Sequence, residues 1–170
     1  MTDRRDWQMA FLKQARSDWE AYQRTRQAVW PHCHRLHFLQ MATEKLGKAL
    51  LIGGHSKLKD VTHSHSAFVK FMHIASNNYG LQSKLKMAKL QLKADFSRLL
   101  PRAYDIEHLA PALAQDGPNP EYPWLDKSGQ IYVPVDYSFP LTNSLQSHQG
   151  IKLLKYIEYS LMAFEKLFLS

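Results

Sequence analysis

An arginine and a histidine at a short distance along the chain form the first pair that could do chemistry. Arg102 and His108 are separated by five residues in the segment "RAYDIEH". A histidine, whose pKa is ordinarily near ~6.5, can take the proton from an RNA 2′-hydroxyl. A permanently charged, fork-shaped guanidinium can stabilise the negative charge that develops on the phosphate. The pair therefore predicts cleavage of RNA without a metal ion as one candidate activity.

The spacing of this pair is weakly specific by itself. Arg26 and His32, in "RQAVWPH", are separated by the same number of residues. The chain has many arginines and histidines, and about one such match is expected by chance. Further support must therefore come from the position of Arg102 and His108 in the fold.

Charge is distributed unevenly along the 170 residues. Residues 57–102 carry nine Lys or Arg and two Asp or Glu, whereas residues 103–170 carry four and eight. A basic region attracts phosphates, RNA or an acidic protein. Its candidate phosphate-binding side chains are Lys84, Lys86, Lys89, Lys93 and Arg98. The alternative interpretation is a solvated helix face whose charge is balanced by other parts of the chain.

Two histidine-rich segments raise the question of a metal site. Cys33 and His37 lie one helical turn apart, and His63 and His65 lie two residues apart. These four side chains could supply zinc ligands, but no second CxxC or HxxxH pair accompanies them. Partly buried polar contacts are the simpler interpretation. The sequence therefore predicts no metal site and no cofactor, and its single cysteine excludes an internal disulfide.

The elements that would position these side chains are helical. Apolar residues recur at helical spacing over residues 3–28, 32–52, 66–76, 81–100 and 143–169. Pro31, the pair Gly53-Gly54 and Pro101 are predicted to end or interrupt helices, and residues 102–114 are expected to form a continuing or kinked helical turn after Pro101. Gly47, inside the second helix, predicts a close crossing with another helix. The predicted fold class is all-α, an up-and-down bundle of about five helices.

The segment 115–142 differs from the rest of the chain in composition. It is rich in proline and aromatic residues, which predict an ordered loop packed on the bundle rather than a disordered linker. A short strand is expected at 130–135. The aromatic side chains within 119–139 are expected in the core or in a dimer interface. The alternative is that the loop covers the lysine-bearing face and offers stacking platforms there.

The overall composition limits the class of protein. Hydrophobic residues make up 45% and charged residues 22%, which is typical of a globular domain. Apolar runs such as "ALLI" are far shorter than the ~20 residues of a membrane span. The first residues, "MTDRRDWQMAFLKQ", lack the apolar core of a secretory signal. We expect a cytosolic protein with a single domain, 1–170, and no membrane contact.

The second predicted helix carries a family resemblance. Its segment "HFLQMATEKLGKALLI" resembles the pattern "fhaqQAaEKalKALL" of the HEPN superfamily. The most specific part is the pair Glu44-Lys45, with Lys48 followed by "ALL". The later segment "THSHSAFVKFM" is similar to the "tHdL..L" segment that opens the next helix in that superfamily. The resemblance covers roughly residues 15–75.

The resemblance implies a fold and a range of activities. HEPN domains are helical bundles that usually dimerise, so a homodimer is expected. Many are ribonucleases of toxin–antitoxin and defence systems, and others bind RNA, nucleotides or partner proteins without catalysis. The family's catalytic signature is an arginine, a polar residue, several further residues and a histidine. Arg102 and His108 are the matching candidates, although Ala103 stands where the polar residue is expected.

Three functions remain open from the sequence. The first is a HEPN-like module, non-catalytic or weakly catalytic, that binds RNA, a nucleotide or a partner protein in stress or defence. The second is a metal-independent endoribonuclease that uses Arg102 and His108. The third is a pure interaction subunit whose loop and C-terminal helix dock a partner. Without catalysis, Arg102 is expected to pair with Asp105 or Glu107, and His108 to pack beneath the proline-rich loop.

Overall fold

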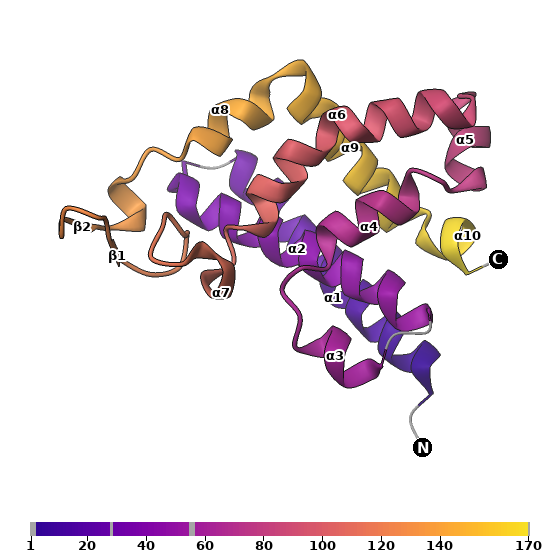
Figure 1. Ribbon diagram of the computed structural model, residues 1–170, viewed down its shortest axis with the longest axis horizontal. Helices are drawn as coiled ribbons and strands as arrows, with labels where there is room; N and C mark the ends of the chain where they lie inside the picture. The colour runs from indigo at the N-terminus through magenta and orange to yellow at the C-terminus, as the bar shows by residue number, and fades with distance from the viewer. Residues whose placement is uncertain (1–2, 28, 55–56, 170) are drawn as a thin grey trace.

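The fold is seen in a computed structural model that describes residues 3–27, 29–54 and 57–169 (Figure 1). The longer helices are α1 (Arg4–Gln27), α2 (His32–Gly53), α6 (Lys89–Glu107) and α9 (His148–Met162). The shorter helices are α3 (Leu58–Thr62), α4 (Phe68–Ala75), α5 (Tyr79–Leu85), α7 (Pro111–Ala114), α8 (Pro140–Gln146) and α10 (Phe164–Phe168). The only strands within the described residues are β1 (Trp124–Leu125) and β2 (Ile131–Tyr132), followed by the 3-10 helix η1 (Pro134–Asp136). The predicted all-α fold class is confirmed.

Helix α2 is the central element of the bundle, as its apolar residues on several faces predict. It contacts α1 along its length and also touches α3, α4 and α6. The crossing with α4 is close at Gly47, where a Cβ atom would collide with the backbone of Ala67. The predicted close crossing at Gly47 is therefore confirmed, and the absence of a side chain is what permits it.

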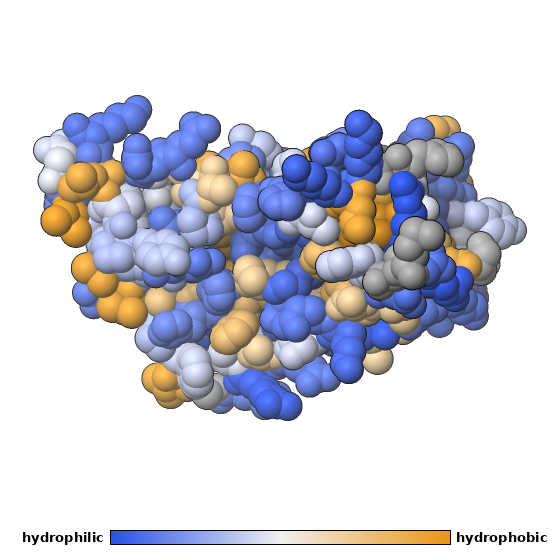
Figure 2. All heavy atoms as spheres, turned by 90° about the horizontal axis from the view of Figure 1, so that it is seen from below, coloured by the Kyte–Doolittle hydropathy of each residue, from blue (hydrophilic) through white to orange (hydrophobic). Residues whose placement is uncertain are grey.

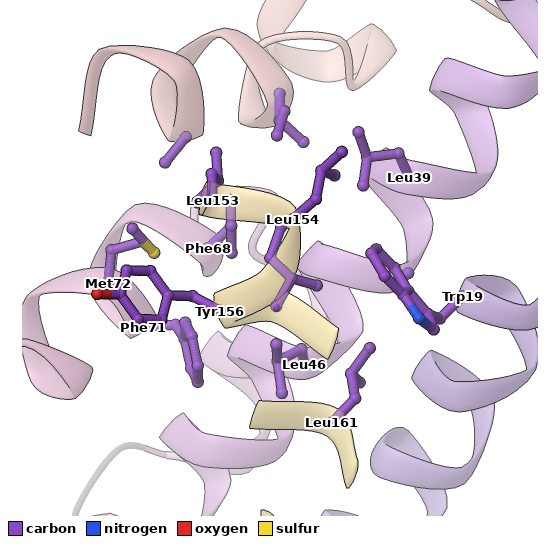
Figure 3. Close-up of a cluster of buried hydrophobic side chains, with 14 of the residues drawn as sticks. Trp19, Leu39, Leu46, Phe68, Phe71, Met72, Leu153, Leu154, Tyr156 and Leu161 are labelled. Atoms are coloured by element: carbon purple, nitrogen blue, oxygen red, sulfur yellow. The ribbon is translucent and has the colours of Figure 1, made fainter. Parts of the chain in front are cut away.

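The core is formed where α1, α2, α4 and α9 converge (Figure 3). Trp19 comes from α1, Leu46 from α2, Phe71 from α4, and Leu153 and Leu161 from α9. These helices are brought together because each presents an apolar stripe at helical spacing. Helix α6 adds Leu92, Phe96 and Leu99 to the same cluster.

The helix predicted at 81–100 is wrong in its boundaries. The chain breaks between α5 and α6, where Lys86 adopts a left-handed backbone with φ of 51°. The Gln91 side chain then accepts a hydrogen bond from the Ala88 amide, which helps α6 to begin. Pro101 does not interrupt α6, which continues to Glu107. Leu99 and Ala103, both fully buried on either side of Pro101, supply packing that offsets the cost of an interior proline.

The C-terminal helix predicted at 143–169 consists of three helices rather than one. Ser147 separates α8 from α9, and its hydroxyl caps α9 by accepting a hydrogen bond from the Gly150 amide at 3.2 Å. A cap of this kind favours a helix start at the serine. Helix α9 ends at Met162, and Ala163 leads into α10. A short helix, α3, also lies between the helices predicted at 32–52 and 66–76.

The proline-rich segment forms an ordered arm with a small antiparallel hairpin. Trp124 pairs with Tyr132, and Leu125 with Ile131, so the strand predicted at 130–135 is confirmed in β2. Trp124 and Phe139 are buried, and their rings pack against Tyr137. The hairpin lies at the opposite end of the molecule from α5 (Figure 1). The alternative that this loop covers the lysine-bearing face is therefore wrong.

The face that Figure 2 shows is mostly hydrophilic, with apolar side chains at the hairpin end and in a further patch towards the opposite end. The hairpin and its flanks expose Leu125, Ile131, Val133 and Val135. None of the helices in the described ranges has the length and apolarity needed to cross a lipid bilayer.

Candidate functional site

An apolar groove of about 820 Å³ with charged edges lies between α5 and α9. Its floor is apolar and aromatic and consists of Leu85, Ile151, Tyr156 and Tyr159. Its rim is basic and consists of Lys84, His148, Lys152 and Lys155. The volume falls within the range of about 300–1,000 Å³ that is usual for ligand sites. We refer to this feature as the α5–α9 groove.

Helix α9 supplies most of the groove from one face. His148, Lys152, Lys155 and Tyr159 follow one another at steps of four, three and four residues, which places them on the same side of a helix. The α9 residues were not among the predicted site residues, because the greater excess of positive charge lies in residues 57–102. The signal that would have found them is the segment "HQGIKLLKYIEY".

A buried ionic cluster supports the groove from below. Asp95 of α6 is buried, and one of its oxygens lies 2.5 Å from Lys152 Nζ. The Tyr156 hydroxyl donates a hydrogen bond to the same oxygen at 2.8 Å. Burial alone would raise the pKa of Asp95, but hydrogen bonds from Lys152 and Tyr156, together with nearby positive charge, leave this pKa lowered. Burial and the bond to Asp95 raise the pKa of Tyr156, so its hydroxyl keeps its proton.

The remaining cations of the groove are not neutralised by the described residues. Lys152 is paired with Asp95, but Lys84 and Lys155 form no ion pair with any carboxylate in the described part of the chain. Lys84 Nζ instead lies 6.0 Å from the centroid of the Tyr159 ring, a cation–π contact. The groove therefore combines an apolar floor with exposed positive charge, which suits a ligand that has flat apolar groups and negative charge.

The cations predicted from the sequence do not share one surface. Lys84 lies on the groove rim, whereas Lys93 lines a separate small hollow between α4 and α6 together with His73. Arg98 is about 140° around α6 from Lys93, and its positive charge acts on Asp95. Lys86 and Lys89 are exposed at the break between α5 and α6. Of the five predicted cations, only Lys84 lines the groove.

The Arg102–His108 pair lies on α6 and at its end. Their separation corresponds to about 9 Å along the axis and about 120° around it. His108 is the C-cap residue of α6, and its ring stacks on the Tyr104 ring with 3.7 Å between the two centroids. Its Nδ1 donates a hydrogen bond to the Tyr104 carbonyl oxygen at 3.0 Å. Within one molecule the two side chains therefore have different neighbours.

Arg102 contacts the junction of α8 and α9. Its Nη2 donates to the Ser147 hydroxyl at 3.4 Å, and its Nε is buried without a hydrogen-bond partner. The alternative prediction that Arg102 pairs with Asp105 or Glu107 is wrong. No such ion pair occurs in the described residues, and the buried Glu107 carboxylate accepts a hydrogen bond from the Val69 amide at 3.0 Å.

The cysteine and histidines considered as metal ligands have other contacts. Cys33 is buried, and burial raises the pKa of its thiol. His37 Nδ1 lies 3.0 Å from a Glu121 carboxylate oxygen. His63 donates to the Lys59 carbonyl oxygen. No group of three or more His, Cys, Asp or Glu in the part of the chain that the structure describes is arranged to hold a metal ion.

The residues that carry the HEPN resemblance form a buried polar cluster in α2. Lys48 Nζ lies 2.7 Å from one Glu44 oxygen and donates to the Thr62 carbonyl oxygen at 3.0 Å. The other Glu44 oxygen accepts from the Gln40 amide at 2.8 Å and from His65 at 3.2 Å. Burial would raise the pKa of Glu44, but the bond and charge of Lys48, with help from Gln40 and His65, leave it lowered. This cluster links α2 to the end of α3 and to the segment that follows it.

The neighbouring Lys45 forms a second link, because its Nζ lies 2.6 Å from Asp18 of α1. The Lys45–Asp18 pair therefore joins α2 to α1, whereas the Glu44–Lys48 pair lies within α2 and reaches α3 through the Thr62 carbonyl oxygen. No protein-family model, no curated protein and no solved structure matches this chain.

Proposed function

We propose that this chain is a HEPN-like helical module that binds single-stranded RNA in the α5–α9 groove and does not cleave it. The observation that carries the proposal is the groove itself, where an aromatic floor lies beside Lys84 and Lys155, whose charges are not neutralised by the described carboxylates. Lysines contribute affinity by neutralising phosphates. Aromatic rings contribute by stacking on bases.

The chemistry of the groove favours RNA binding that tolerates many sequences. Its floor offers rings and aliphatic side chains but few groups that could read the hydrogen-bonding edge of a base. Stacking on Tyr159 would require a base to take the place of Lys84 over that ring. Lys84 would then be released to contact a phosphate. Such a site binds nucleotides without a strong preference for one base.

The absence of catalysis in this proposal rests on the contacts of Arg102 and His108. Arg102 holds the α8–α9 junction through Ser147, and His108 stacks on Tyr104 about a third of a turn away around α6. A second copy of the chain could bring the two side chains together, so the ribonuclease alternative is kept as a prediction to be tested. The homodimer, the cytosolic location and the role in stress or defence also remain predictions.

Fluorescence anisotropy with a labelled oligouridylate at several salt concentrations tests the proposal. The test variant combines Lys84→Gln and Lys155→Gln, and the matched control combines Lys70→Gln and Lys127→Gln, which are exposed lysines outside the groove. The test variant should bind more weakly, with the slope of log K against log salt reduced by roughly 0.7 for each lost phosphate contact. Tyr159→Leu should weaken binding without changing the slope.

Equal weakening in the test and control variants would reject the groove as the site. A wild-type chain that binds no RNA at low salt would reject the proposed function. If that chain binds polyglutamate instead, the surface serves an acidic protein partner.

A further inference from the structure

A second, smaller pocket lies on the other flank of α9 from the groove. Its volume is about 180 Å³, and it is formed where the end of α1 and the start of α2 meet α8 and α9. Ile151 lines both this pocket and the α5–α9 groove, so the two hollows are neighbours separated by the Ile151 side chain. The polar side chains that line the pocket are Tyr22, Arg26, Arg35, Thr142 and Gln146. We call it the arginine pocket.

Two polar atoms in the walls of the arginine pocket are buried without a hydrogen-bond partner. They are Arg35 Nε and Thr142 Oγ1. The guanidinium of Arg35 makes one long hydrogen bond, from Nη2 to the Thr25 carbonyl oxygen at 3.4 Å, although the group carries five N–H donors. Buried polar groups are nearly always hydrogen-bonded in folded proteins. The described residues therefore do not use the full hydrogen-bonding capacity of the side chains that line this pocket.

The charge of the arginine pocket is also unbalanced. Neither Arg26 nor Arg35 forms an ion pair with a carboxylate among the described residues. Arg26 lies over the Tyr22 ring, 5.9 Å from its centroid.

A different hollow along α1 provides the contrast. It contains Arg16 and Arg24 but also Glu20 and Glu158. Arg16 there lies 2.8 Å from Glu165, and Arg24 lies 3.8 Å from Glu20. The lack of carboxylates is thus particular to the arginine pocket and not a general property of α1.

We infer that the arginine pocket is a phosphate subsite, which seats one phosphate group of the RNA strand whose neighbouring nucleotides lie in the α5–α9 groove. This inference rests on the proposed function. A guanidinium matches the oxygen geometry of a phosphate and can donate two parallel hydrogen bonds to it. Thr142 and Gln146 would donate to the remaining oxygens. The pocket is below the usual size of a ligand site, which suits a single phosphate rather than a base.

The strand would cross α9 at Ile151, which is 47% exposed between the two hollows. An exposed apolar side chain at this position can contact a sugar or base while the phosphates on either side meet cations. The positive charge of the arginine pocket and that of the groove would then act on one continuous ligand.

The test measures the affinity for oligouridylate at several salt concentrations for Arg26→Gln and Arg35→Gln. Arg24→Gln, on the same helix as Arg26, is the matched control. The two pocket variants should each bind more weakly, and Arg35→Gln should lower the slope of log K against log salt by roughly 0.7, the value for one phosphate contact on a single strand. Arg24→Gln should keep the wild-type affinity and slope. Arg35→Lys should restore the slope but only part of the affinity, because an ammonium lacks the guanidinium fork.

The outcomes separate the subsite from the proposed function. If Arg26→Gln and Arg35→Gln bind like the wild type while the Lys84 and Lys155 variant is impaired, the subsite is overturned and RNA binding in the groove stands. If the wild type binds no RNA, both are overturned. Because Arg26 is exposed, Arg26→Gln provides the decisive measurement should thermal unfolding show that Arg35→Gln does not fold.

Discussion

The Tyr156 hydroxyl and the Asp95 carboxylate lie 2.8 Å apart and join α9 to α6 beneath the α5–α9 groove. Lys152, on the rim of the groove, forms an ion pair with the same carboxylate. The contact therefore couples the stability of the bundle to the position of the groove-lining face of α9.

Removing the Tyr156 hydroxyl should destabilise the protein. Tyr156→Phe leaves Asp95 with one hydrogen-bond donor fewer, and a bond to a charged group contributes about 1.5–3 kcal/mol. We expect the free energy of unfolding in urea to fall by that amount. Tyr159→Phe is the control, since no described group accepts a hydrogen bond from that hydroxyl, and it should change the free energy of unfolding by less than about 0.5 kcal/mol. Equal losses in the two variants would contradict this account.

The same cluster predicts a dependence of stability on pH. The pKa of Asp95 is lowered in the folded protein, so its contribution to stability is present above the unfolded-state value of about 3.9. That contribution is lost as the pH falls through the lower folded-state pKa. Wild-type protein should therefore lose more stability than Asp95→Asn on acidification from about pH 5 to pH 2. Parallel losses in urea unfolding of the two proteins would show that Asp95 does not contribute.

Breaking the buried pair in α2 should be more costly than removing both of its members. Lys48→Met leaves the Glu44 carboxylate, whose side chain is 11% exposed, without its main partner. A loss of about 3–5 kcal/mol in the free energy of unfolding is expected. The double variant Glu44→Gln with Lys48→Met should lose less, because no uncompensated charge remains. A double-mutant cycle measures the difference, and additive losses would reject coupling between Glu44 and Lys48.

Cleavage of RNA should not depend on His108. Because Arg102 and His108 contact different elements, we expect wild type and His108→Ala to leave a labelled RNA equally intact in EDTA. Arg102→Gln is informative in the same assay only if thermal unfolding shows that the α8–α9 junction survives. Cleavage by the wild type that is lost in His108→Ala would establish the ribonuclease alternative and overturn the non-catalytic proposal.

Local patterns were sufficient to predict most helices but not their interruptions. The apolar spacing of α1, α2 and α4 comes from residues close together in the chain, and Gly47 marked the crossing with Ala67 correctly. Pro101 predicted an interruption that does not occur, because buried neighbours on both sides hold α6 together. The break at Lys86 had no strong local signal, since a lysine rarely adopts a left-handed backbone.

In the candidate site, too, some features follow from the sequence and others do not. The sequence by itself determined the helical class, the buried faces and the excess of positive charge, because these depend on residue types and on spacing within single helices. Only the tertiary structure decided which cations meet. It placed Lys84 of α5 beside Tyr159 of α9, set Lys93 of α6 in one hollow with His73 of α4, and brought Arg26 of α1 and Arg35 of α2 into one pocket with residues of α8. The packing of side chains between helices sets such meetings, and no single helix contains that information.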